Sequence, residues 1–148
     1  MTESQNIRVA VNGYGVIGKR VADAVAAQDD MTLAGVADVV TDWRMRVVRQ
    51  KGYPLFGAAS EHVSAMREAG LDPEGDLDDL MDSADVIVDC TPKKVAIQNV
   101  ERYRAAGIKF IVQGGEKHDV TGHSFSAENN YASALGRDST RVVSCTTT

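Results

Sequence analysis

The sequence is short of several features that would point to particular classes of protein. Its 148 residues contain only two cysteines, Cys90 and Cys145, which excludes a disulfide framework. No stretch is apolar over the ~18 residues that a membrane span needs, and residues 1–6 carry no apolar signal-peptide region. A net charge of −5 and a pI of about 5.1 argue against a basic nucleic-acid surface. These absences predict a cytoplasmic protein with no membrane or nucleic-acid partner.

Short apolar segments that resemble strands alternate with helical patterns along the whole chain. The predicted strands span residues 7–11, 31–37, 54–59, 84–90, 108–112 and 141–144, with 54–59 as an edge strand because it contains Pro54. Helices are predicted from Val16 onward, over 60–69 with Ser60 as N-cap, over 94–106 and over 129–135. Residues 39–52 are ambiguous, and 75–81 form a short acidic helix or turn. This alternation predicts a doubly wound parallel sheet, a Rossmann-type α/β domain over 1–148.

Three glycines near the start of the chain form the pattern G-x-G-x-x-G. They are Gly13, Gly15 and Gly18, and they stand between the first predicted strand and the first predicted helix. In such a loop the first glycine permits a tight turn, the second lets a pyrophosphate approach the backbone, and the third lets the helix pack on the strand. The helix N-terminus then offers free N–H groups to the phosphates. This context predicts a dinucleotide site, with a glycine-rich turn of no function as the alternative.

The preference between NAD and NADP is left open by the charged residues after the second predicted strand. Asp38 follows Gly18 by 20 residues, where a carboxylate accepts hydrogen bonds from the adenosine ribose and repels the 2′-phosphate of NADP. Alternatively, Asp38 is a solvated residue that ends a strand. Arg44, Arg46 and Arg49 favour NADP if one of them neutralises that phosphate, or else they form the wet face of a helix.

Cys145 follows the last predicted strand, at the sheet edge where open α/β sheets bind ligands. A helix beginning at Thr146 would favour the thiolate. A thiolate beside a nicotinamide suggests aldehyde oxidation through a hemithioacetal and a thioester. The alternative is an inert cysteine that fills the core. Cys90 also ends a strand, but Pro92 follows it closely, and we interpret Cys90 as structural and lining the cofactor cleft.

Four blocks of the sequence resemble the N-terminal domain of archaeal-type (class II) phosphorylating glyceraldehyde-3-phosphate dehydrogenases. The blocks are Val9–Val21, Asp89–Pro92, Gln113–Lys117 and Arg141–Cys145, in the order and spacing of that family. The resemblance implies a homotetrameric enzyme that uses NAD or NADP, glyceraldehyde 3-phosphate and inorganic phosphate, and that makes 1,3-bisphosphoglycerate.

The resemblance also assigns roles to individual residues. It implies that Cys145 is the nucleophile and that Ser144, Cys145 and Thr146 border the substrate. It places Val16 and Ile17 against the cofactor through their backbone groups. The remaining cofactor contacts would come from Gly13, Gly15, Gly18, Asp38, Thr91, Gly114 and Gly115. No metal site is predicted.

The chain departs from the family pattern at several positions. Lys93 and Lys94 replace glycines, Thr146 stands in the place of an asparagine, and Asp38-Val39 replaces a Thr-Lys pair. These changes affect the expected cofactor contacts and cofactor preference.

None of the three histidines, His62, His118 and His123, matches the family's base, which lies in a second domain after the nucleophile. We interpret His118 and His123 as surface residues. The chain is therefore expected to be the cofactor domain alone, able to bind a nucleotide but inactive as an enzyme. The alternatives are the cofactor domain of a semialdehyde dehydrogenase and a nucleotide-binding module without chemistry.

Overall fold

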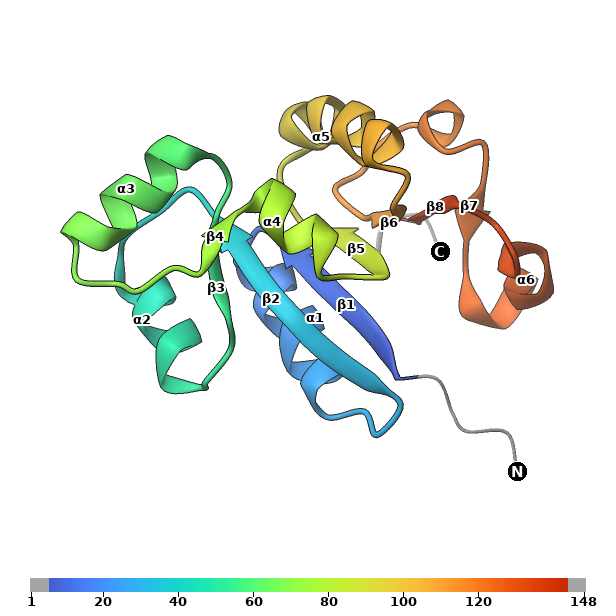
Figure 1. The fold of residues 1–148 in the computed structure, drawn as a ribbon. Helices are drawn as coiled ribbons and strands as arrows, with labels where there is room; N and C mark the ends of the chain where they lie inside the picture. The colour runs from blue at the N-terminus through green and yellow to red at the C-terminus, as the bar shows by residue number, and fades with distance from the viewer. Residues whose placement is uncertain (1–5, 144–148) are drawn as a thin grey trace.

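A single parallel sheet runs through the molecule. The computed structural model describes residues 6–143. The strand order is β4-β3-β2-β1-β5-β6-β8-β7, and every neighbouring pair is parallel (Figure 1). Between the short edge strands β4 and β7, the other six follow the 3-2-1-4-5-6 order of doubly wound dinucleotide-binding domains. The predicted fold class is confirmed. The strands are β1 (Ile7–Asn12), β2 (Met31–Asp38), β3 (Leu55–Gly57), β4 (Gly75–Asp76), β5 (Val86–Asp89), β6 (Lys109–Val112), β7 (Ser124–Phe125) and β8 (Ser139–Val142).

Helices cover both faces of the sheet (Figure 1). They are α1 (Val16–Ala26), α2 (Trp43–Gln50), α3 (Ser60–Glu68), α4 (Leu77–Asp82), α5 (Lys93–Ala106) and α6 (Ala127–Ala134), with a 3₁₀ turn at His118–Val120. Val9 and Val11 of β1 pack with α1 and α2, whereas Ala10 between them packs with α4 and α5. Because side chains alternate along a strand, β1 contributes to both cores. No helix within residues 6–143 is long and apolar enough to cross a membrane.

The ambiguous stretch 39–52 contains helix α2. Asp42 caps this helix, and its carboxylate accepts a hydrogen bond of 3.0 Å from the backbone N–H of Arg44. An N-cap carboxylate satisfies a helix N–H that otherwise has no partner. Met45 and Val48 are fully buried against the sheet, so tertiary packing decides the helical conformation.

Several predicted boundaries are wrong, each for a local reason. β3 is not an edge strand, because β4 pairs with its outer side. Ser60 is not the N-cap of α3; Ala59 is extended and its carbonyl accepts the first helical bond from Val63. The last strand is β8, which begins at Ser139 rather than at Arg141, since it pairs with β6 there.

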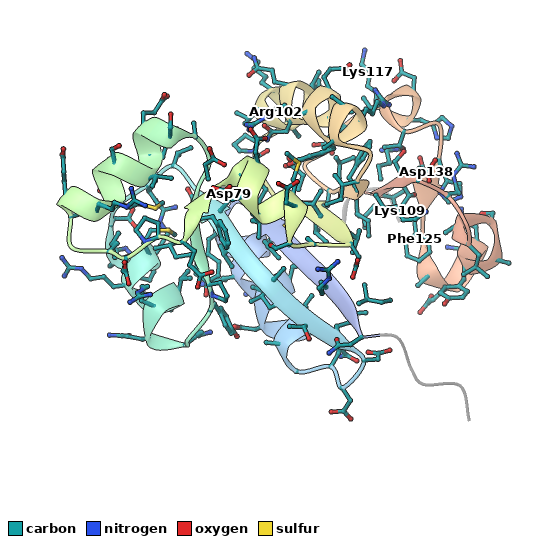
Figure 2. The ribbon with its side chains drawn as sticks, viewed as in Figure 1. Asp79, Arg102, Lys109, Lys117, Phe125 and Asp138 are labelled. Atoms are coloured by element: carbon teal, nitrogen blue, oxygen red, sulfur yellow. The ribbon has the colours of Figure 1, made fainter. Side chains whose placement is uncertain are left out.

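Ion pairs at the surface join neighbouring elements. Lys109 of β6 lies 3.2 Å from Asp138, the residue before β8 (Figure 2). Arg102 of α5 lies 2.9 Å from Asp78 of α4. Both pairs are solvent-exposed, and such pairs contribute about 0–1 kcal/mol. The fold therefore depends on its two apolar cores rather than on these charges.

The order of the strands also locates the binding crevice. After β1 the chain crosses to α1 on one face, and after β5 it crosses to α5 on the other face. The carboxyl ends of β1 and β5 therefore lie at the point where the direction of winding reverses. Ligands of open α/β sheets bind in the crevice at this point.

Candidate functional site

A cleft of about 940 Å³ opens at the carboxyl ends of the central strands. Six segments form it: the glycine loop, the end of β2 with the start of α2, the residue after β3, the turn after β5 with α5, the loop after β6, and the end of β8. The lining residues are Asn12, Gly13, Tyr14, Gly15, Ile17, Asp38, Val39, Val40, Arg44, Ala58, Cys90, Thr91, Pro92, Val95, Asn99, Gln113, Gly114, Gly115, Val142 and Val143.

The first and third glycines of the loop serve the fold itself. Gly13 has a φ of +94°, which residues other than glycine rarely adopt. Its N–H donates to the carbonyl of Ala37 over 2.8 Å. A Cβ atom at Gly18 would lie 1.8 Å from the carbonyl oxygen of Gly13. Gly18 therefore lets α1 rest directly on the turn that follows β1.

Gly15 is different, because nothing within the described residues 6–143 explains why it is a glycine. Its φ of −82° suits any residue, and a Cβ atom there would meet none of their atoms within 4 Å. Gly15 lines the cleft and stands at the N-cap of α1, where no side chain caps the helix. An open approach to uncapped helix N–H groups fits the pyrophosphate of a dinucleotide.

Asp38 is buried at the end of β2, with an exposed fraction of 9%. One carboxylate oxygen, Oδ2, accepts the N–H of Tyr14 over 2.7 Å, and the other, Oδ1, accepts the N–H groups of Val39 and Val40 over 2.6 and 3.3 Å. Asp38 lines the cleft, as its predicted role requires. It also ties the glycine loop to β2, a role that the sequence pattern did not indicate.

Of the three arginines of α2, Arg44 alone lines the cleft. Its Nε and Nη2 donate to the Asp42 carboxylate, with an Nη2–Oδ2 distance of 2.6 Å. Arg49 instead points to Asp72, with 3.7 Å between the charged groups, and Arg46 is exposed.

A buried polar network supports the turn after β5. The carboxylate of Asp89 is fully buried and accepts hydrogen bonds from the Thr91 N–H (2.9 Å), the Tyr103 hydroxyl (2.6 Å) and the Asn99 amide (3.1 Å). The Asn12 amide in turn donates to the Tyr103 hydroxyl over 2.9 Å. Asn12, Thr91 and Asn99 line the cleft, so this network fixes the position of that part of the cleft wall. Sequence reasoning missed it, although Asp89-x-Thr91 is a common Asx-turn pattern.

The loop after β6 brings Gly114 and Gly115 to the cleft, where their predicted contacts with the cofactor would require them. A Cβ atom at Gly114 would lie 2.8 Å from both the Glu116 carboxylate and the Thr91 carbonyl. The carboxylate of Glu116 is buried, and neither of its oxygens has a hydrogen-bond partner within the described residues. Gly114 therefore allows close packing of this loop against the turn after β5.

Cys90 lines the cleft, as predicted, and is partly buried. Burial, together with the nearby Asp89 carboxylate, raises the pKa of the Cys90 thiol to about 12. A thiol with such a pKa is almost entirely protonated near neutral pH and is a poor nucleophile. This fits the structural role expected for Cys90.

The other predicted site residues have mixed placements. Thr91 and Ile17 line the cleft, whereas Val16 does not, and its side chain is 63% exposed. The three residues Ser144, Cys145 and Thr146 lie outside the described residues. Val142 and Val143, which come directly before them in the chain, line the cleft.

No histidine within residues 6–143 lines the cleft. His118 is exposed, as expected. The prediction of a surface position is wrong for His123, which is only 8% exposed. Its two ring nitrogens lie 2.7 Å from the Thr140 hydroxyl and 2.9 Å from the Ser133 hydroxyl, because the loop folds back on β8.

Residues 7–117 match the family model described as dihydrodipicolinate reductase, N-terminus. The chain belongs to this family. The match runs from β1 to the loop after β6 and so includes the glycine loop, Asp38 and Gly114. The family therefore shares most of the segments that build the cleft.

Curated relatives with about half of their aligned residues identical are glyceraldehyde-3-phosphate dehydrogenases. That of Methanothermobacter thermautotrophicus is 53% identical over 142 residues, which cover 96% of this chain and 42% of the relative. That of Methanothermus fervidus is 49% identical over 140 residues, which cover 95% and 42%. The chain thus spans 42% of the length of these relatives. The predicted kinship with the archaeal-type enzymes is confirmed.

Solved structures with similar folds are oxidoreductases of low sequence identity. GenD2 from gentamicin A biosynthesis, in complex with NAD, has a TM-score of 0.54 and 20% identity over 74% of this chain and 27% of its own. Saccharopine dehydrogenase from Saccharomyces cerevisiae has a TM-score of 0.53 and 19% identity over 72% and 21%. They show the fold alone. This fold confirms the predicted Rossmann-type α/β domain.

Proposed function

We propose that the chain is the cofactor-binding part of a phosphorylating glyceraldehyde-3-phosphate dehydrogenase. The observation that carries this proposal is the open, uncapped N-terminus of α1 at Gly15, in a chain about half identical to such enzymes. Neither the backbone conformation nor the packing of the protein requires a glycine there, but a closely bound pyrophosphate does.

In this proposal each part of the dinucleotide has its own part of the cleft. The N–H groups at the start of α1, including those of Val16 and Ile17, bind the pyrophosphate. The adenosine lies toward Asp38 and the start of α2, since a carboxylate at the end of the second strand receives ribose hydroxyls. The nicotinamide lies at the other end, beside Thr91, Gly114 and Gly115, which line that part of the cleft.

Cys145 is the proposed nucleophile. It follows the cleft-lining residue Val143 by two positions in the sequence. Its thiolate attacks the aldehyde carbon of glyceraldehyde 3-phosphate and forms a hemithioacetal, with Ser144 and Thr146 bordering the substrate. The bound dinucleotide supplies the hydride acceptor that makes the oxidation to a thioester possible. Inorganic phosphate then attacks the thioester carbonyl, releases 1,3-bisphosphoglycerate and returns the thiolate.

The described residues do not supply a histidine base to this cleft. We therefore propose that residues 1–148 are one NAD(P)-binding Rossmann domain, and that the base and the phosphate contacts belong to a second domain. The 148 residues alone then bind the cofactor without useful turnover, because acid-base help is worth about 10²–10⁴ in rate. A homotetrameric assembly stays a prediction from the resemblance, and a cytoplasmic location stays a prediction from the composition.

Calorimetry of the 148-residue chain with NAD and NADP tests the binding part of the proposal. We expect saturable binding of at least one of them, and no heat with either would refute it. The chemical part is tested on the protein from the complete reading frame. Phosphate-dependent reduction of the nicotinamide with glyceraldehyde 3-phosphate supports it, whereas a preference for aspartate semialdehyde would favour the semialdehyde dehydrogenase alternative. Binding without either activity would favour a nucleotide-binding module.

A further inference from the structure

The adenosine end of the cleft is surrounded by an unusual arrangement of charges. Asp38 and Arg44 line it, and Arg44 is paired with Asp42, the residue that caps α2. From this arrangement we propose that the chain selects NAD over NADP, and that the Asp42–Arg44 pair enforces the choice by withholding the arginine from a 2′-phosphate. This inference rests on the proposed dinucleotide site and specifies which of the two cofactors it takes.

Asp38 contributes the first part of the selection. A carboxylate offers about four acceptor positions, and Asp38 uses three of them on the N–H groups of Tyr14, Val39 and Val40. One position remains, which suits a ribose hydroxyl because a hydroxyl can donate. Near neutral pH the 2′-phosphate of NADP is mostly doubly ionised, so it has no proton to donate to the carboxylate. It also brings about two negative charges close to a buried anion.

The backbone at the end of β2 offers no substitute site for that phosphate. N–H groups at this position could donate hydrogen bonds to phosphate oxygens. Those of Val39 and Val40, however, already donate to Asp38 Oδ1. A phosphate that displaced the carboxylate would leave a buried anion without its partners, which is costly. Asp38 therefore repels the phosphate and also engages the backbone N–H groups that could otherwise bind it.

Arg44 is the cation that could compensate, and Asp42 prevents it. The guanidinium directs Nε and Nη2 at the two Asp42 oxygens, at 3.0, 3.1 and 2.6 Å, in a fork-like contact of the strong kind. Asp42 is further held in place by its hydrogen bond to the N–H of Arg44. The pair thus presents no net charge to the cleft, although one of its members is an arginine.

Asp42→Asn is the informative variant. Asparagine caps a helix about as well as aspartate does, so α2 is retained while Arg44 loses its counter-charge. We expect wild type to bind NAD at least about tenfold more tightly than NADP, and Asp42→Asn to reduce that ratio about tenfold by strengthening NADP binding. Adding Arg44→Ala to Asp42→Asn should abolish the gain for NADP.

The matched control is Asp72→Asn. Asp72 pairs with Arg49 near the other end of the same helix, and neither residue lines the cleft. It makes the same change of net charge, so a shift caused by overall charge alone would appear in both variants. Calorimetry with NAD, NADP, adenosine 5′-monophosphate and adenosine 2′,5′-bisphosphate, with thermal unfolding as a check on the fold, measures the effect.

The outcomes separate this inference from the proposed function. Equal affinity of wild type for NAD and NADP overturns the inference while the dinucleotide site stands. So does an unchanged ratio in folded Asp42→Asn, or an equal shift in Asp72→Asn. If none of the four nucleotides binds to wild type, the proposed function fails and the inference fails with it. The selective shift in Asp42→Asn, repeated with the two adenosine nucleotides, supports the inference.

Discussion

The Asp38 carboxylate accepts a hydrogen bond of 2.7 Å from the backbone N–H of Tyr14, 24 residues earlier in the chain. This bond joins the end of β2 to the middle of the glycine loop. A second bond in the same place, from the Gly13 N–H to the Ala37 carbonyl, supports it. The loop that would receive a pyrophosphate is therefore held by the strand that would receive the ribose.

Replacement of Asp38 by alanine should destabilise the fold as well as the site. It leaves the N–H groups of Tyr14 and Val39 without their acceptor, and such a loss costs about 1–3 kcal/mol. Urea unfolding of Asp38→Ala measures the loss. Asp72→Ala is the control, because the Asp72 side chain is 86% exposed and should change the free energy of unfolding by less than about 0.5 kcal/mol. Equal effects in the two variants would contradict the tethering role of Asp38.

Alanine at Gly15 and at Gly18 should give opposite results. At Gly18 the new Cβ would collide with the Gly13 carbonyl, so we expect a loss of about 1–3 kcal/mol in the free energy of unfolding. At Gly15 the Cβ meets no atom of the residues that the structure describes, so stability should change by less than about 1 kcal/mol.

Dinucleotide affinity should distinguish the two variants further. Gly15→Ala should lose about tenfold or more in affinity, because its methyl group occupies the approach to the pyrophosphate. Thermal unfolding and calorimetry of both variants measure the two effects. A Gly15→Ala protein that binds as wild type does would argue against a pyrophosphate at this loop.

The sequence pattern predicts the central fold but not the hydrogen bonds that support the cleft. Gly13, Gly15 and Gly18 predict a strand, a turn and a helix, because each position restricts the backbone or its neighbours in a known way. The hydrogen bonds of Tyr103 with Asp89 and with Asn12 join residues that are 14 and 91 positions apart in the sequence, and only tertiary contact creates them.

Edges and capping residues were also poorly predicted, for a related reason. Pro54 suggested an edge strand, but the two-residue strand β4 that covers β3 has no apolar pattern of its own. His123 stands in a polar segment, and its burial depends on Thr140 of a strand 17 residues later. Local composition does not contain such contacts.

Removal of the Tyr103 hydroxyl tests the network beneath the cleft. Tyr103→Phe leaves the buried Asp89 carboxylate and the Asn12 amide each without one partner, at a cost of about 1–3 kcal/mol. Tyr131→Phe, at a side chain that is 61% exposed, is the control and should be close to neutral. Urea unfolding compares the two. A neutral Tyr103→Phe would mean that the network adds no stability.

The two cysteines should differ in reactivity over the pH range 6–9. The pKa of Cys90 is raised to about 12, so at pH 8 only about one thiol in 10⁴ is a thiolate, and labelling of Cys90 by iodoacetamide should be very slow. Because this pKa lies above the whole range, the rate at Cys90 should rise about tenfold per pH unit without a plateau. Cys145, as the proposed nucleophile, should titrate below the ordinary thiol value of ~8.5 and react first.

Variants with one cysteine assign the labelling to a residue. Cys90→Ser should label like wild type, and Cys145→Ser should remain almost unlabelled at pH 8, as measured by the mass of the intact chain. Fast labelling that survives in Cys145→Ser would show that the environment of Cys90 is described wrongly. A Cys145 that titrates at or above ~8.5 would instead favour a module that binds nucleotide without thiol chemistry, because a catalytic thiol needs its thiolate near neutral pH.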